Sequence, residues 1–293
     1  MTWVKKIKTF FKTNDALTGL IAVNVAVFVL YHAIRVIYVL FAALHHFPLD
    51  RWMAVPSDPD TLLRYPWTLV TYMFFHQGVL HLLFNMLWLY WFGKIFRLYF
   101  SGWQLVNVYL FGGWAGALFY VLFYNIFPAF ATEKYFALLL GASAGVLAVV
   151  MAISCYVPKY TVNLLFLGRI RLMTIALVTV VIDIISISAS NNAGGHIAHL
   201  GGAFLGYLFA VNIHQRRDIT AWFGRFCAWM GSLFKPKPKL KVAFRRPPTD
   251  DREYNRQKNE NQQEIDRILD KISKGGYESL SRAEKETLFN QKG

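Results

Sequence analysis

Six long apolar stretches constrain this chain more than any other feature of its sequence. Each is close to or above the 20 or so residues that an α-helix needs to cross the hydrocarbon core of a bilayer. They are Leu17–Ile34, Pro66–Phe92, Trp103–Phe127, Tyr135–Tyr156, Arg171–Ser188 and Gly194–Ile213. The sequence therefore predicts an all-α membrane protein, a bundle of six transmembrane helices.

The basic residues are distributed as in a multi-pass membrane protein. The net charge is +14, yet only 16% of the residues are charged, and nearly all the excess lies before residue 245, between the apolar stretches. Lys and Arg gather on one set of helix flanks, and the opposite flanks carry only Arg35, Arg51, Arg64 and Lys134. Since positive flanks stay inside, we expect both termini in the cytoplasm and an integral protein of the cell (inner) membrane. This bias makes the lipid bilayer the expected partner and excludes a nucleic acid.

The segment after the first apolar stretch is expected to form an outer loop. A charge at the middle of a bilayer costs about 2.5–3.5 kcal/mol, so we expect the first helix to end just before Arg35. The following residues, Val36–Arg64, remain apolar and include Trp52 and Met53. We therefore expect this loop to be embedded in the outer leaflet.

Composition divides the chain into four parts. Residues 1–15 form a basic amphipathic segment, and residues 16–213 hold the six transmembrane helices. Residues 214–248 contain an interfacial helix with an aromatic stripe through Trp222, Phe226 and Trp229, followed by a Pro/Lys linker. Residues 249–293 form a small cytoplasmic helical tail, whose partner the sequence does not identify.

Two short helices are expected in this tail. The first has an apolar face and ends at Gly275–Gly276. Its face consists of Ile265, Ile268, Leu269 and Ile272. Ser281 and Glu284 have the spacing of a capping box, which predicts the start of the second helix.

Polar residues inside the apolar stretches are the candidates for chemistry, because they are costly in a membrane and tend to be functional. They are His76, His81, Asn85, Ser143, Asp183, His196 and His199. The fourth and sixth helices run in the same direction, which places Ser143 and His199 roughly 10 and 8 Å below the outer boundary. A serine hydroxyl beside an imidazole can act as a nucleophile with its base.

Glycine spacing predicts that these helices approach closely. Gly141 and Gly145 are four residues apart in the fourth stretch, and Gly202 and Gly206 are four apart in the sixth. Small residues at this spacing let helix backbones pack tightly in lipid. A short serine side chain can then reach a histidine on the neighbouring helix.

A hydroxyl that attacks a carbonyl needs donors for the oxyanion. His81 and Asn85 are four residues apart and share one face of the second helix. Together with the backbone N–H of Ser143, they are candidate oxyanion contacts.

The runs His81–Asn85, Gly141–Ser143 and Ala198–Gly206 resemble the rhomboid family of intramembrane serine proteases, over about residues 16–213. The resemblance implies that Ser143 is the nucleophile and His199 the base of a catalytic dyad, with His81 and Asn85 supporting the oxyanion. His199 is favoured over His196 because only His199 is followed by glycine at the third and seventh positions after it. No cofactor and no metal are implied.

Other interpretations of the polar residues remain. His196, His199 and Asp183 could ligate a metal, but no HExxH pattern accompanies them. Asp183 is expected to be a structural partner, of His196 for example, and not a catalytic acid. We interpret His76 as an interfacial or water-facing group, and Trp88 as part of an aromatic belt at the inner interface.

The resulting hypothesis is an intramembrane serine endopeptidase that cleaves single-span membrane proteins. The substrate helix is expected to enter between the second and fifth helices. The alternatives are a catalytically silent rhomboid-like protein that binds or escorts membrane helices, and a transporter or channel that uses the polar residues as a pathway.

Overall fold

The computed structural model describes residues 15–42, 49–164, 168–189, 192–223, 225, 226, 229 and 251–289. The chain divides into two compact units, residues 1–235 and 236–293, which are described separately. The expected N-terminal amphipathic segment and the Pro/Lys linker lie outside the described residues, apart from Asp15. Of the expected interfacial helix, residues 221–223, 225, 226 and 229 are described, and they are helical.

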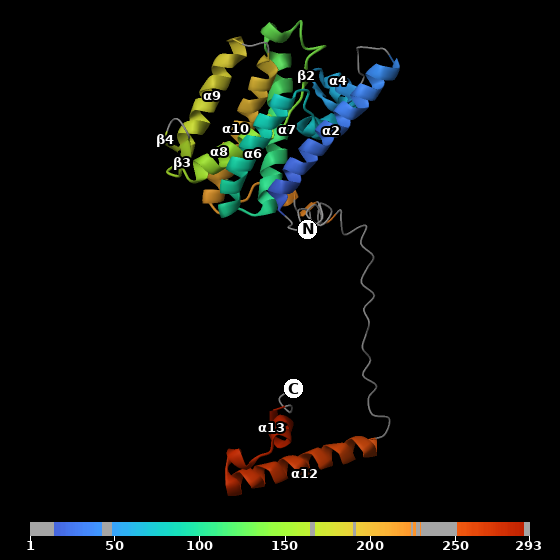
Figure 1. The fold of residues 1–293 in the computed structure, drawn as a ribbon, viewed down its shortest axis with the longest axis vertical. Helices are drawn as coiled ribbons and strands as arrows, with labels where there is room; N and C mark the ends of the chain where they lie inside the picture. Colours follow the sequence, from blue (N-terminus) through green and yellow to red (C-terminus); the bar gives the residue numbers. More distant parts are fainter. Residues whose placement is uncertain are drawn as a thin grey trace. The chain divides into compact units, whose positions relative to one another are not determined.

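The first unit is a helical bundle, which confirms the predicted all-α class. Five of its described helices are long and apolar enough to cross a membrane. They are α2 (Ala16–Ala42), α6 (Val79–Tyr99), α7 (Gly102–Ile126), α9 (Leu172–Ala189) and α10 (Ala193–His214). In Figure 1, α9 forms one side of the bundle and α2 the other, with the remaining helices between them.

The centre of the bundle is a sixth apolar helix, α8 (Ser143–Tyr156). It is buried continuously from Ala144 to Ser154. The helices packed most extensively against one another are α8, α10 and α7, and α6 and α9 flank α8. The residue that begins α8 is therefore held by neighbours on several sides.

The first helix is longer than expected. α2 does not end before Arg35 but continues through it to Ala42. The sequence between these residues contains no proline or glycine that would break the helix. The cost of burying a charge influences where a helix lies in the membrane, but it does not end the backbone hydrogen bonding.

The second and fourth apolar stretches are not continuous helices. In the second, α5 (Thr68–Thr71) and the short 3-10 helix η1 (Tyr72–Phe74) precede α6. In the fourth, β2 (Leu138–Leu139) pairs antiparallel with β1 (Val55–Pro56), and helix forms only from Ser143. Hydropathy fails here because buried extended backbone is as apolar as a buried helix.

Short elements complete the first unit. They are α3 (Leu49–Met53), α4 (Pro59–Arg64), the 3-10 helix η2 (Pro128–Phe130) and a hairpin of β3 (Thr161–Leu164) with β4 (Gly168–Arg171). The hairpin was not predicted. Asp58 caps α4 by accepting hydrogen bonds from the Thr61 backbone and hydroxyl, which lower the pKa of its carboxyl.

The second unit contains α12 (Asp251–Gly275), the 3-10 helix η3 (Tyr277–Ser279) and α13 (Arg282–Phe289). The predicted capping box is confirmed: the Ser281 backbone donates to Glu284 Oε2 at 2.7 Å, and the Glu284 backbone donates to Ser281 Oγ at 3.3 Å. The predicted helix end is also confirmed, because Gly276 follows α12 with a φ of +72°. Ile268 and Leu280 are its buried apolar side chains among the described residues.

Candidate active site

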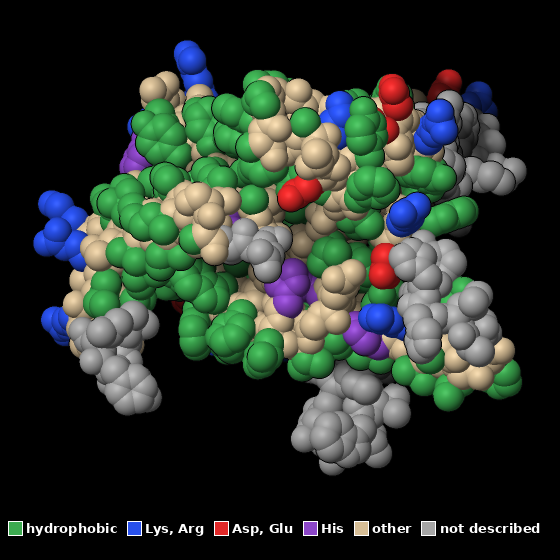
Figure 2. Space-filling model, turned by 90° about the horizontal axis from the view of Figure 1, so that it is seen from above, with side chains coloured by type: hydrophobic (Ala, Val, Ile, Leu, Met, Phe, Trp, Pro, Cys, Tyr) green, Lys and Arg blue, Asp and Glu red, His purple; other side chains and the backbone are tan. Residues whose placement is uncertain are grey.

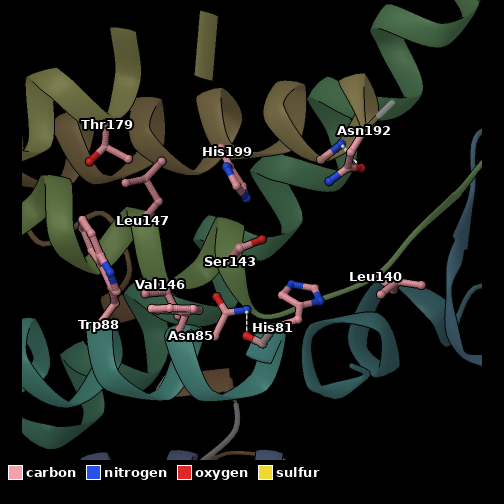
Figure 3. Close-up of a pocket in the computed structure, with 12 residues that line it drawn as sticks. His81, Asn85, Trp88, Leu140, Ser143, Val146, Leu147, Thr179, Asn192 and His199 are labelled. Atoms are coloured by element: carbon pink, nitrogen blue, oxygen red, sulfur yellow. Dashed lines mark hydrogen bonds between the residues drawn. The ribbon is translucent and has the colours of Figure 1, made fainter. Parts of the chain in front are cut away.

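A cavity of about 310 Å³ brings the four candidate residues together. Its lining includes His81 and Asn85 from α6, Ser143 from the start of α8 and His199 from α10. In Figure 3 the His199 ring points from α10 toward Ser143, and His81 lies on the opposite side of the serine. Figure 2 shows histidine side chains at the surface of one face of the bundle, among hydrophobic side chains. Among the hydrogen bonds of the described residues, none joins Ser143 directly to His199.

Ser143 is the first residue of α8, and Ala142 is its N-cap. The first hydrogen bond of the helix runs from the Val146 N–H to the Ala142 carbonyl at 2.9 Å. The Ser143 N–H therefore belongs to the first turn, where amides have no partner within the helix. This placement leaves the amide available beside its own hydroxyl.

The residues before Ser143 are fixed by η1 and its following loop. The Gly141 N–H donates to the Tyr72 carbonyl at 2.9 Å, and the Ala142 N–H donates to His76 Nε2 at 3.3 Å. His76 is fully buried. The interpretation of His76 as a water-facing or interfacial group is therefore wrong, because the ring supports the backbone that leads to Ser143.

Gly141 lies close to both the His81 ring and the Ser143 hydroxyl. A Cβ on Gly141 would be 2.9 Å from His81 Nε2 and 3.7 Å from Ser143 Oγ. Its φ is +119°, in the region that favours glycine. Gly141 was expected on a helix face with Gly145, but it lies before the helix, where it leaves room for His81.

The other three glycines lie against neighbouring backbone, but only Gly202 and Gly206 join the fourth and sixth helices as predicted. A Cβ on Gly202 would lie 2.1 Å from the Ala144 carbonyl oxygen, and one on Gly206 would lie 2.3 Å from that of Ala148. Gly145 faces α7, where its Cβ would lie 2.6 Å from the Tyr109 carbonyl oxygen. Since α10 contacts the backbone of α8 directly, His199 is held close to the start of α8.

Asn85 is buried on α6 one turn after His81. Its Nδ2 donates to the His81 carbonyl at 2.9 Å, the bond drawn in Figure 3. An amide NH₂ carries two hydrogens. One hydrogen holds the side chain against its own helix, and the other is available to a group in the cavity.

Asp183 makes a contact that the sequence analysis did not foresee. Its Oδ1 lies 2.8 Å from His196 Nδ1 and 2.8 Å from His199 Nδ1. The expected partnership with His196 is present, but the same oxygen also binds the candidate base. His196 and His199 are three residues apart on α10, and Asp183 reaches them from α9.

The same three side chains have the composition of a metal site. Their ligand atoms all lie within 4.8 Å of one another. Two imidazoles with one carboxylate suit zinc. In this structure hydrogen bonds already join the three groups, and these bonds account for their orientation.

Sequence reasoning missed most of the apolar cavity wall. Trp88, which the sequence analysis assigned to an aromatic belt, lines the cavity and stacks on Phe92 at 5.2 Å. Trp88 follows Asn85 by about one helical turn and therefore shares its face of α6, which was the feature of the sequence that could have placed Trp88 at the cavity. The remaining lining residues are Phe84, Leu140, Val146, Leu147, Thr179, Asn192 and Gly195.

Comparison with known proteins agrees with this architecture. The Rhomboid domain model matches residues 64–216, which is more than half of the chain. A family of unknown function, DUF6576, matches residues 249–290.

Two curated relatives also match. The "RHOMBOID-like protein 12, mitochondrial" of Arabidopsis thaliana is 26% identical over 213 residues, 70% of this chain and 60% of that protein. The "Rhomboid protease GlpG" of Serratia proteamaculans (strain 568) is 33% identical over 107 residues, 30% of this chain and 38% of that protein. The chain thus spans less than two thirds of either relative.

The family match covers the helices that form the cavity, and the bundle around them has the apolar spans of an integral membrane protein. This chain belongs to the rhomboid family.

Proposed function

We propose that this protein is an intramembrane serine endopeptidase that cleaves transmembrane helices of single-span membrane proteins. The observation that carries the proposal is the shared cavity, where Ser143, His199, His81 and Asn85 converge from three helices. A nucleophile, a base and oxyanion donors in one partly enclosed site are the groups that acyl transfer requires.

In the proposed mechanism, His199 Nε2 takes the proton of the Ser143 hydroxyl while Oγ attacks the substrate carbonyl. The Ser143 N–H, Asn85 Nδ2 and His81 stabilise the oxyanion. His199 then protonates the leaving amine, and water hydrolyses the acyl-enzyme. Because no hydrogen bond joins Ser143 and His199 in this structure, the two side chains must approach each other before the proton moves. Catalytic hydrogen bonds commonly tighten in this way when the substrate complex forms.

The cavity walls suggest the route of the substrate. Phe84 and Trp88 come from α6, and Thr179 comes from α9. α9 packs on α8 and α10 and exposes apolar side chains such as Ile182 and Ile185 along its outer face. We propose that the substrate helix enters between α6 and α9. With both termini cytoplasmic, as the basic flanks indicate, the cavity opens toward the outer side of the cell (inner) membrane.

Covalent labelling and cleavage test the proposal together. The full-length protein is reconstituted in vesicles with a reporter transmembrane helix and is separately treated with a fluorophosphonate probe. Ser143→Ala abolishes both signals, and His199→Ala reduces cleavage to background. Ser154→Ala is the matched control, because Ser154 is a buried serine on the same helix, remote from the cavity.

The assignment fails if the probe labels the Ser143→Ala protein as strongly as the wild type. Binding of the reporter helix without cleavage by the wild-type protein would instead identify a silent, helix-binding rhomboid. Ion or solute flux without cleavage would indicate a transporter or channel.

A further inference from the structure

Asp183 is the polar exception on an apolar helix. The residues of α9 that are buried are Leu172, Ala176 and Asp183. Asp183 is 3% exposed, whereas its neighbours Ile182 and Ile184 are 54% and 55% exposed. A carboxyl group taken out of water is costly unless it is hydrogen-bonded. Its contacts with α10 therefore decide what this residue does.

Both contacts converge on a single atom. The Nδ1 atoms of His196 and His199 lie 2.8 Å from Asp183 Oδ1, and the two rings are nearly perpendicular at 83°. A carboxylate oxygen has two lone pairs and only accepts hydrogen bonds. Each imidazole must then carry its proton on Nδ1, and the two rings approach the oxygen from different directions.

This arrangement has a direct consequence for the base. A neutral imidazole with its proton on Nδ1 has an unprotonated Nε2. Figure 3 shows the His199 ring extending from α10 toward Ser143. In this tautomer Nε2 can accept the proton of the Ser143 hydroxyl, whereas in the other tautomer Nε2 already carries a proton and only Nδ1 could accept one. A carboxylate at Nδ1 also stabilises the imidazolium that forms when the proton arrives.

We propose that Asp183 is a positioning residue, which holds His199 in the tautomer and orientation of a general base. His196 completes the unit as the second donor to the same oxygen and thereby keeps the carboxylate facing α10. The site is then a serine–histidine pair oriented by a buried carboxylate, with a second histidine bound to that carboxylate. The inference rests on the proposed protease function.

The test combines kinetics with direct observation of the tautomer. Asp183→Asn keeps the shape of the side chain but offers an NH₂ that can donate to His199 Nδ1 and stabilise the wrong tautomer. A loss of kcat of about 10²- to 10⁴-fold is expected, the upper limit being the effect of the equivalent change in a serine protease triad. KM should change little, because Asp183 is not among the residues that line the cavity. Asp183→Glu, which restores a carboxylate, should recover part of the lost kcat.

Ser188→Ala provides the matched control. Ser188 is an exposed residue of the same helix, and its hydroxyl donates to the Ile185 carbonyl at 3.2 Å. This variant should keep wild-type kcat and KM. A merely structural loss in Asp183→Asn would lower the amount of folded, probe-reactive protein without changing the kcat of that fraction.

The tautomer is measured by ¹⁵N NMR on the full-length protein labelled at histidine, with His199→Ala used to assign the signal. The wild type should show a protonated Nδ1 and an unprotonated Nε2 at His199. This measurement needs no activity, and it stands even if Asp183→Asn does not fold.

A protonated Nε2 in the neutral wild-type ring would overturn the inference, as would an active protein whose kcat is unchanged by Asp183→Asn. Failure of the protease proposal looks different: the wild type would show the expected tautomer but would neither cleave the reporter nor react with the probe at Ser143.

Discussion

Gly202 of α10 lies directly against the backbone of Ala144 in α8, so closely that a Cβ on Gly202 would be 2.1 Å from the Ala144 carbonyl oxygen. Ala144 follows Ser143, and Gly202 is three residues after His199. The contact therefore sets the distance between the two helices at the level of the candidate dyad.

Replacing Gly202 with alanine should destabilise the bundle and reduce cleavage. The new methyl group meets backbone, which cannot move aside, and overpacking of this kind costs about 1–3 kcal/mol. The midpoint of thermal unfolding in detergent measures the change. Gly19→Ala is the control, because a Cβ at Gly19 in α2 has no heavy atom within 4 Å. Equal midpoints for the two variants would contradict the close contact.

Gly141→Ala should reduce cleavage with little effect on global unfolding. The added Cβ would lie 2.8 Å from His81 Cε1, so the ring must move, and a φ of +119° is strained for alanine. Gly168→Ala in the β3–β4 hairpin separates backbone strain at a positive φ from displacement of the His81 ring. Its φ is +70°, but nothing lies within 4 Å of its Cβ. If Gly168→Ala lowered kcat as much as Gly141→Ala, displacement of His81 would not be the cause.

Asn85→Ala should lower kcat by about 10²- to 10³-fold, the usual effect of removing one oxyanion donor. KM should change much less, because the donor acts on the charge that develops during the reaction. Asn212→Ala is a matched control, since Asn212 Nδ2 donates to the Leu208 carbonyl at 2.8 Å, the same bond that Asn85 makes in its own helix. A wild-type kcat for Asn85→Ala would remove Asn85 from the proposed oxyanion site.

Glu284 should make the packing of the second unit sensitive to acid. Hydrogen bonds from Lys271 and from Ser281 lower the pKa of its carboxyl from 4.5 to about 2. Because the folded-state pKa is depressed, the stabilisation is complete above the ordinary pKa and is lost as the pH falls toward 2. Titration of the Glu284 carboxyl carbon by NMR on the full-length protein measures the midpoint. Lys271→Gln should raise it, and a wild-type midpoint near 4.5 would contradict the observed pairing.

Removing residues 249–293 should leave basal cleavage unchanged. The residues that line the cavity all belong to the first compact unit, and the removed residues belong to the second. Cleavage of the reporter helix by the truncated protein is the measurement, and probe labelling of Ser143 reports whether the bundle remains folded. Complete loss of cleavage with intact labelling would give the tail a role in substrate handling.

The sequence predicted the fold well where hydropathy and helical structure coincide. α7, α9 and α10 lie within a few residues of their predicted bounds. Polar residues flank α9 and α10 at both ends, whereas α7 begins after Ser101 and ends before Phe127 and Pro128. The prediction failed for the fourth stretch. Its first half, Tyr135–Ala142, is as apolar as a transmembrane helix but contains β2, and hydropathy cannot distinguish these two states. The pairing of β1 with β2 joins residues more than eighty positions apart and has no local signal.

The candidate site was predictable as a set of residues but not as a geometry. Polar groups in apolar spans gave seven candidates, and depth, helix-face spacing and the rhomboid resemblance selected four of them: Ser143, His199, His81 and Asn85. The depth estimate treated the fourth stretch as helical from its start, whereas α8 begins at Ser143 itself. The role of Asp183 depends on how α9 packs against α10. Spacing along the chain did not indicate that one carboxylate oxygen would meet two histidines.

The position of Asp183 on α9 links two regions of the protein that would otherwise be independent. The same helix supplies Thr179 to the cavity wall and, one turn later, the carboxylate that binds His196 and His199. α9 therefore cannot swing outward at this level without stretching both hydrogen bonds. Any widening of this flank of the bundle is mechanically coupled to the anchoring of the two imidazoles.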